Sequence, residues 1–227
     1  MAHQCARVVE KVDAAKENGG YLDLSNCQLT QVPDAIFLLM KNVNLHSCNL
    51  SNNVITKIPP KLPTNFSLIK VLDLSNNRVS GLPNEMRNLT LLETLDISWN
   101  SFDSLPPVIA EMPNIRVINA KRNLIVEVEL ETFTGSVHLE SLNLENNPLN
   151  EGNYEKLTKV TSVKILLSEP GQTEDKHVSR SLDSKYDSKS RSPSKSKTEE
   201  EIKQVEIETN INLANPPPPP PPPPPRD

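Results

Sequence analysis

The side chains that could carry catalysis are scattered along this sequence and match no catalytic motif. The four histidines are His3, His46, His138 and His177. None of them has a Ser or Cys partner at a spacing that implies a nucleophile, and the sequence holds no phosphate-binding glycine loop or C-x-x-C pair. Asp73 and Asp96 recur at one place in two similar segments. On neighbouring strands they would lie about 4.8 Å apart, close enough for a carboxylate dyad or a cation site.

Repetition of the segments explains the Asp73–Asp96 pair better than chemistry does. We therefore predict that the chain is not an enzyme and has no metal or cofactor site. The three cysteines, Cys5, Cys27 and Cys48, form no paired spacing, so we expect no disulfide framework.

A second group of side chains is suited to recognition. Trp99 is the only tryptophan, and Lys121 and Arg122 follow one segment later, with Arg116 nearby. Trp and Arg are enriched among the residues that dominate binding energy at interfaces. Two interpretations stay open: Trp99 packs its ring over the neighbouring turn, or it anchors a partner.

These side chains are positioned by a repeated segment. Six segments share apolar residues at repeat positions 1, 4, 6 and 11 and an Asn or Cys at position 9. They begin at Gly19, Leu45, Ile69, Leu92, Ile115 and Leu139. Gly19 at position 1 and Ala120 at position 6 are the weak members. A second register places apolar residues at positions 14 and 18, and Pro follows position 14 in four segments.

The segments, for example IKVLDLSNNRV and LESLNLENNPL, resemble those of the leucine-rich repeat superfamily over about residues 19–150. Positions 4 and 6 point to the same face of a strand, and Pro suits a connection outside the hydrogen-bonded ladder. We therefore predict an α/β leucine-rich repeat solenoid, with short parallel strands on the concave face and a helical or irregular convex side, followed by a disordered tail.

The position-9 asparagines have a predicted structural role. An amide side chain can donate and accept hydrogen bonds at once, so it can satisfy backbone groups that the turn would bury. We expect an internal ladder of five residues: Asn53, Asn77, Asn100, Asn123 and Asn147. Cys27 can replace Asn only weakly.

Four regions follow from these patterns. Residues 1–18 form an N-terminal capping helix, with Ala6, Val9, Val12 and Ala15 at near-helical spacing, and six repeats fill residues 19–150. Residues 151–171 form a C-terminal cap with a short helix and a last strand. Residues 172–227 form a polar tail rich in Ser, Lys and Glu that we expect to be disordered.

Outward strand positions form the predicted partner-binding face, which is polar and partly acidic. The candidate residues on and beside it are Tyr21, Asp73, Asp96, Trp99, Arg116, Asn119 and Arg122. A curved, rigid sheet of this kind suits a protein partner.

The tail carries two further candidates. Ser192 precedes Pro193 in a basic setting and resembles a kinase substrate site, with an inert linker as the alternative. Ten consecutive prolines span residues 216–225, and Pro221, Pro224 and Arg226 fit P-x-x-P-x-R. A polyproline II rod is ordered before docking, so SH3, WW or profilin-like modules are candidate partners. A stiff end without a dedicated partner is the alternative.

The net charge of −5 argues against binding to a nucleic-acid backbone. No run of about 18 apolar residues predicts a membrane span, and the N-terminus does not resemble a secretory signal. We expect a monomeric cytoplasmic protein, with the nucleus as an alternative, that acts as a protein-binding scaffold or adaptor. The alternative function is a regulatory or targeting subunit of an enzyme such as a phosphatase.

Overall fold

The computed structural model describes residues 2–129 and 138–169 of the chain. Contacts divide the chain into two units, Met1–His177 and Val178–Asp227, and all described residues belong to the first. The tail predicted over 172–227, with Ser192, Pro221, Pro224 and Arg226, lies outside the described residues.

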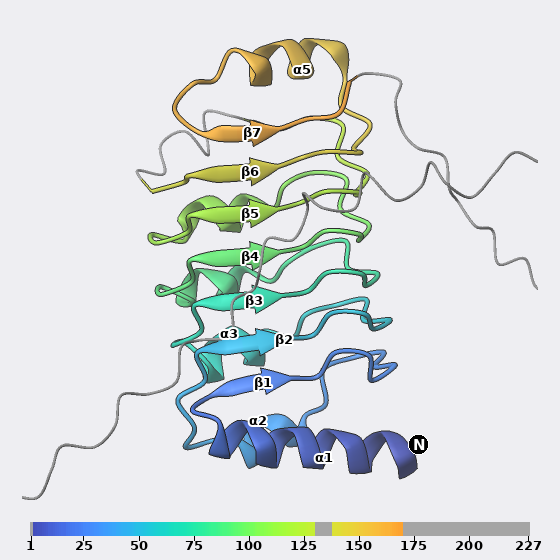
Figure 1. Ribbon diagram of the computed structural model, residues 1–227, viewed down its shortest axis with the longest axis vertical. Coiled ribbons are helices and arrows are strands. Elements are labelled where there is room, and N and C mark those ends of the chain that lie inside the picture. The colour runs from blue at the N-terminus through green and yellow to red at the C-terminus, as the bar shows by residue number, and fades with distance from the viewer. Residues whose placement is uncertain (1, 130–137, 170–227) are drawn as a thin grey trace, which may run out of the picture. The chain divides into compact units, whose positions relative to one another are not determined.

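Seven three-residue strands form one parallel sheet in the order β1 to β7, which confirms the predicted solenoid (Figure 1). The strands are β1 Tyr21–Asp23, β2 Ser47–Asn49, β3 Val71–Asp73, β4 Thr94–Asp96, β5 Val117–Asn119, β6 Ser141–Asn143 and β7 Lys164–Leu166. Equivalent repeat positions are in register, as Leu72 is with Leu95 and Asp73 with Asp96.

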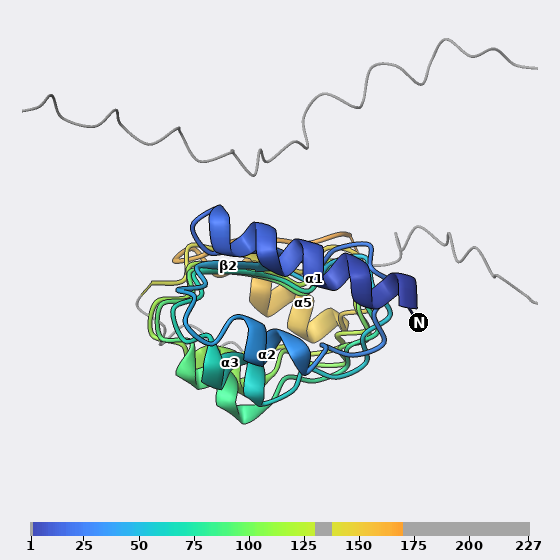
Figure 2. The ribbon, with the colours of Figure 1, turned by 90° about the horizontal axis from the view of Figure 1, so that it is seen from below.

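Short helices form the return path of each of the first four repeats. They are α2 Ala35–Leu39, α3 Lys61–Asn65, and the 3₁₀ segments η1 Asn84–Asn88 and η2 Pro107–Glu111. Figure 2 shows α2 and α3 on one side of the sheet, so neither of these return-path helices covers the opposite face of the strands. A proline precedes or begins each of these last three segments, where its missing N–H costs no ladder bond.

Alternation along the strands builds the core. Leu72 on β3 and Leu95 on β4 are fully buried, and so are Leu74 and Ile97, which directly follow these strands, as the expected inward positions require. Leu149 at position 11 of the sixth repeat is only partly buried. The core is thus a continuous stack to which every repeat adds one layer.

Helix α1, Ala2–Glu17, packs against β1 at one end of the sheet (Figures 1 and 2). Its buried stripe is Val8, Val12 and Ala15. The expectation that Val9 faces the repeats is wrong: Val9 is exposed, because it lies about 100° around the helix from Val8. Gly19, expected in the core at repeat position 1, is also exposed.

Gly20 makes the tight exit from α1. Its φ of +91° is a left-handed value, and an added Cβ would collide with the Asn44 carbonyl oxygen. Its own carbonyl accepts from the N–H groups of His46 and Ser47. A residue with a side chain here would therefore push the second repeat away from the first.

The predicted asparagine ladder is confirmed by its hydrogen bonds. Asn77 is representative: its Oδ1 accepts from the Ile55 N–H at 3.0 Å. Its Nδ2 donates to the Leu50 and Leu74 carbonyls at 3.0 and 3.1 Å. Leu50 belongs to the previous repeat and Leu74 to its own, so each side chain ties two turns together. Cys27, which stands at the same position in the first repeat, donates a weak bond from Sγ to the Ser25 carbonyl at 3.3 Å.

Asn153 extends the ladder beyond the five predicted asparagines. It lies in helix α5, Glu151–Thr158, which is N-capped by Asn150. Its Oδ1 accepts from the Val128 N–H at 3.1 Å and its Nδ2 donates to the Val128 carbonyl at 3.0 Å. The sequence pattern missed it because its place is on a helix, outside the repeat template.

Replacing Asn77 with Ala should destabilise the fold by about 1–3 kcal/mol, because the buried Ile55 N–H loses its acceptor. The Leu50 and Leu74 carbonyls each lose one donor but keep another, from Asn53 and Asn100. Asn76→Gly is the matched control: Asn76 is exposed, and Gly accepts its left-handed backbone, so we expect a loss below about 1 kcal/mol. Urea unfolding of both variants measures the difference. Equal losses for the two neighbours would contradict a special role for the ladder.

Candidate functional site

The last residue of each of the first six strands has a structural duty that the sequence analysis did not foresee. These residues are Asp23, Asn49, Asp73, Asp96, Asn119 and Asn143. Each accepts, through Oδ1, a hydrogen bond from the backbone N–H two residues later, at 2.8–3.2 Å. An Asx-type turn therefore ends every one of these strands. The candidates Asp73, Asp96 and Asn119 stand in this column.

Two of these candidates are linked directly. The Asn119 Nδ2 donates to Asp96 Oδ2 at 2.8 Å, while Asp96 Oδ1 also accepts from the Ser98 hydroxyl at 2.6 Å. Both carboxylate oxygens of Asp96 are thus engaged by protein donors. This arrangement orients the carboxylate for structure and leaves it unlike a free catalytic base.

The two aspartates flanking Asn49 have opposite pKa shifts. Burial raises the pKa of Asp73; hydrogen bonds from Ser75 oppose the rise, and the charges of Asp96 and Asp23 add to it. Burial also acts on Asp23, but hydrogen bonds from Ser25 and the ion pair with Lys11, at 3.2 Å, lower its pKa overall. The charged form of Asp73 is therefore disfavoured in the folded protein, whereas that of Asp23 is stabilised by its hydrogen bonds and by Lys11.

The turn after each strand requires a left-handed residue at repeat position 8. The φ angles there lie between 52° and 57° at Asn26, Asn52, Asn76, Trp99, Arg122 and Asn146. Asn tolerates this conformation better than other residues that carry a Cβ. Trp99 and Arg122, in adjacent repeats, depart from the pattern and adopt the same strained backbone.

Trp99 and Arg122 contact each other. The Arg122 guanidinium lies 4.2 Å from the centre of the Trp99 ring, and Trp99 remains 50% exposed. Such a stack is worth about 0.5–1 kcal/mol at an exposed site. The contact with Arg122 fits the interpretation that Trp99 packs against the neighbouring turn, while its exposed half is consistent with the anchor, which stays a prediction.

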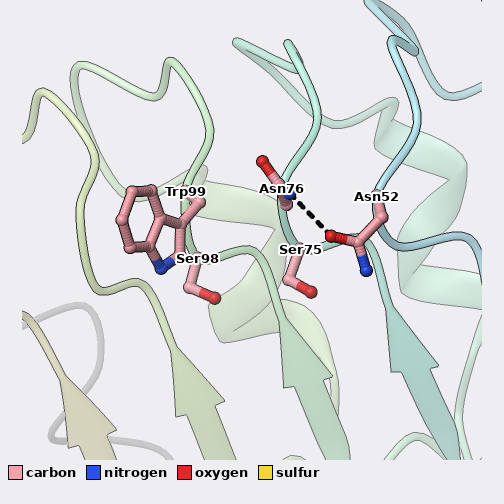
Figure 3. Close-up of a pocket in the computed structure, with 5 residues that line it drawn as sticks. All are labelled: Asn52, Ser75, Asn76, Ser98 and Trp99. Carbon is pink, nitrogen blue, oxygen red and sulfur yellow. Dashed lines mark hydrogen bonds between the residues drawn. The ribbon is translucent and has the colours of Figure 1, made fainter. Parts of the chain in front are cut away.

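A shallow hollow of about 360 Å³ lies beside this stack, between the turns that follow β2, β3 and β4. Figure 3 shows its lining: Asn52, Ser75, Asn76, Ser98 and Trp99. The Asn76 Nδ2 donates to Asn52 Oδ1 at 2.6 Å. The lining of the hollow is thus made of side-chain amides, hydroxyls and one indole ring.

Comparison with protein families decides the identity of this framework. One family model described as a leucine-rich repeat matches residues 43–102 and 92–149, and a second matches residues 21–39. The chain belongs to the leucine-rich repeat family. Its other relatives and structural neighbours agree with this assignment.

Curated relatives match part of the leucine-rich repeat region. Leucine-rich repeat-containing protein 20 of Mus musculus and its Homo sapiens counterpart are each 35% identical over 92 residues, which is 39% of this chain and 50% of theirs. E3 ubiquitin-protein ligase LRSAM1 of Mus musculus is 38% identical over 80 residues, or 34% of this chain and 11% of that protein. The chain spans about half the length of the first two relatives.

Solved structures show the same fold. The leucine-rich repeat domain of APL1B has a TM-score of 0.52 at 22% identity, covering 62% of this chain and 42% of that one. An internalin (inlF) from Listeria monocytogenes has a TM-score of 0.50 at 23% identity, covering 61% and 38%. At these identities the likeness concerns the fold alone.

The other predicted partner-binding residues in the repeats lie apart from the Trp99–Arg122 contact. Arg116 precedes β5 and Arg122 follows it, so they lie at opposite ends of that strand. Arg116 pairs with Glu140 at 2.8 Å, and Tyr21 is exposed on β1, three strands from β4. The structure therefore joins Trp99 with Arg122 and Asp96 with Asn119, but it does not bring all seven residues together.

Residues 2–129 and 138–169 contain no group of three metal-ligating side chains. No helix in the same described residues is long and apolar enough to span a bilayer. Cys48 is fully buried, and burial together with the charges of Asp73 and Asp23 raises its pKa to about 12, so its thiol is protonated and unreactive at neutral pH.

Asp73→Asn should stabilise the repeats at neutral pH. The folded pKa of Asp73 lies above that of the unfolded chain, so stability falls as the pH rises through this range. Asn keeps an oxygen for the Ser75 N–H and removes the charge. We expect a gain of up to about 1 kcal/mol at pH 7 that vanishes below about pH 4, measured by urea unfolding.

Asp23→Asn provides the control of opposite sign at the same repeat position. The pKa of Asp23 is lowered, so its charge contributes stability above the unfolded pKa and loses it as the pH falls. This variant should be weaker at pH 7. If Asp73→Asn lost as much stability at pH 7 as Asp23→Asn, the charge of Asp73 would not be unfavourable in the folded protein.

Proposed function

We propose that this protein is a non-catalytic scaffold that binds a protein partner with the concave face of its repeats and the adjoining turns. Leucine-rich repeat domains serve generally as protein-interaction modules, and the parallel sheet supplies a rigid surface of the kind they use. Within that surface we place the anchor at Trp99 and Arg122.

The strained backbone of the Trp99–Arg122 pair carries this proposal. A left-handed residue other than Gly or Asn costs on the order of 1–2 kcal/mol, and the other four repeats place Asn at position 8. The first turn also holds left-handed Gln28, two residues after Asn26. The mutual stacking of Trp99 and Arg122 recovers only part of this cost. Strain that folding does not require is a feature of binding sites, and Trp and Arg are the residue types that dominate interface energies.

The surroundings of the pair suit a polypeptide partner. Side-chain amides of Asn52 and Asn76 and the Ser75 hydroxyl line the adjacent hollow, where they can pair with an extended backbone. Lys121 lies beside Arg122 in sequence and pairs with Glu145 at 3.0 Å, which keeps the local charge balanced. We therefore expect an anchor made by the aromatic and guanidinium groups and a register set by the amides.

Trp99→Asn and Arg122→Asn together should reduce partner binding by about 30-fold or more, the effect of losing one hot spot. Stability should change by less than about 1 kcal/mol, because Asn suits the left-handed turn. Proximity labelling in cells identifies the partner set, and titration of a labelled partner with the purified protein measures its affinity. Arg87→Ala, on the convex side, is the matched control.

An unchanged partner set and affinity in the Trp99→Asn, Arg122→Asn double variant would remove the anchor from the proposal. Loss of binding together with a loss of several kcal/mol in stability would show a structural role instead. Retained binding in the Arg87→Ala control is required for either conclusion.

We further propose that the polyproline segment recruits a second protein, which would make the chain an adaptor. Pro221, Pro224 and Arg226 satisfy the spacing of an SH3 ligand, whereas WW and profilin-like grooves need the prolines alone. A run of ten prolines favours the polyproline II conformation, so docking would cost little conformational entropy.

Arg226→Glu separates the classes of tail-binding module. An SH3 domain should lose about tenfold or more in affinity for this variant, since the trailing Arg would no longer find a carboxylate. Profilin should bind the variant and the original chain alike. Fluorescence titration with one purified domain of each class measures both, and no binding by any class would refute recruitment through the tail.

A further inference from the structure

The outer edge of β7 lacks the backbone pairing with a following strand that each of the first six strands makes. In each of the first six strands, two backbone groups pair with the next strand: the carbonyl of repeat position 2 and the N–H of position 6. In the sixth repeat these are the Glu140 carbonyl, which accepts from the Lys164 N–H at 2.9 Å, and the Leu144 N–H, which donates to the Leu166 carbonyl at 2.9 Å.

The equivalent groups of β7 are the Val163 carbonyl and the Leu167 N–H, given the register of Ser141 with Lys164. Within the described part of the chain, neither group pairs with another strand, because β7 is the last strand of the sheet. Open backbone groups on an edge strand are a template for pairing with another strand.

Two apolar side chains at β7, Ile165 and Leu167, are also less buried than their equivalents in earlier repeats. Leu142 and Leu144 on and after β6 are 1% and 0% exposed, whereas Ile165 and Leu167, which continue the same two columns, are only partly buried. At the opposite end, α1 covers β1 and buries Val12 and Ala15 against it. Helix α1 therefore caps the sheet at β1. At the other end, where α5 lies (Figure 1), Ile165 and Leu167 of the β7 region stay only partly buried.

We propose that the outer edge of β7 binds an extended strand of another polypeptide, parallel to β7, with apolar side chains at alternate positions and a carboxylate facing Lys164. The two open backbone groups have the spacing that pairs parallel strands in the rest of the sheet. Apolar side chains opposite Ile165 and Leu167 would continue the core columns. This surface is separate from the Trp99–Arg122 anchor.

The charge of Lys164 favours a strand with an acidic side chain at the facing position. Lys164 is exposed and takes part in none of the ion pairs among the described residues, so an acidic side chain at the facing position adds a favourable cross-strand pair. A second copy of this chain fits less well. A twofold pair of β7 strands would be antiparallel and would bring two Lys164 side chains to the same face of a three-residue contact.

The test uses the isotope-labelled full chain and the peptide acetyl-Thr-Glu-Val-Thr-Val-Thr-amide. Its Glu would face Lys164, and its two Val residues would continue the columns of Ile165 and Leu167. We expect the amide exchange of Leu167 to slow on binding and the NMR shifts of residues 163–167 to move. The peptide Thr-Glu-Val-Val-Thr-Thr, of equal composition but without alternation, should do neither.

A charge exchange tests the assigned facing position. A peptide with Lys in place of Glu should bind about 2- to 5-fold more weakly, which corresponds to the free energy of one cross-strand charge pair. Lys164→Glu should reverse this preference. Because Lys164 is exposed, the variant should unfold at the same urea concentration as the original chain.

Three results would overturn the proposal. The first is equal binding of the alternating and non-alternating peptides. The second is a Leu167 amide that is already protected in the free protein at low concentration, because the edge would then be occupied. The third is protection that grows with protein concentration in the absence of peptide, which would assign the edge to a second copy.

Discussion

Each ladder asparagine ties two consecutive turns together, and the geometry of the whole solenoid depends on this bridge. A three-residue strand makes few hydrogen bonds, and the chain must then leave the sheet while its backbone groups are buried. The side chains of Asn53, Asn77, Asn100 and Asn123 satisfy those groups with one oxygen and one nitrogen each. One repeat cannot do this alone, because half of the partners belong to its neighbour.

This bridge determines the shape of the surface beside it. The residue before each ladder asparagine is left-handed, so its side chain is displayed at the rim of the sheet. Where Asn occupies that place, as at Asn52 and Asn76, the turn is relaxed. At Trp99 and Arg122 the same geometry holds an aromatic ring and a guanidinium group in contact, which links the stability of the fold to the proposed binding of a partner.

The repeat template predicted the parallel strands, the buried columns and the ladder, because each depends on residue spacing within one repeat. Asn153 escaped because it reaches the ladder from a helix, and Val9 was misplaced because two helical registers fit the same short apolar pattern. The Asx-type turns at Asp73 and Asp96 were not predicted, although Asp and Asn side chains at the end of a strand commonly accept from the backbone N–H two residues on. The Trp99–Arg122 contact needed coordinates, whereas the break in the asparagine pattern at position 8 was visible in the sequence.

Native-state hydrogen exchange tests the central bridge most directly. The amides of Ile55, Val79 and Phe102 donate to ladder side chains rather than to another strand. We predict that they exchange only through global unfolding, as slowly as the amides of the central strands. Exchange of these three amides at the rate of exposed loops would show that the asparagine side chains do not hold the turns, and would contradict the account.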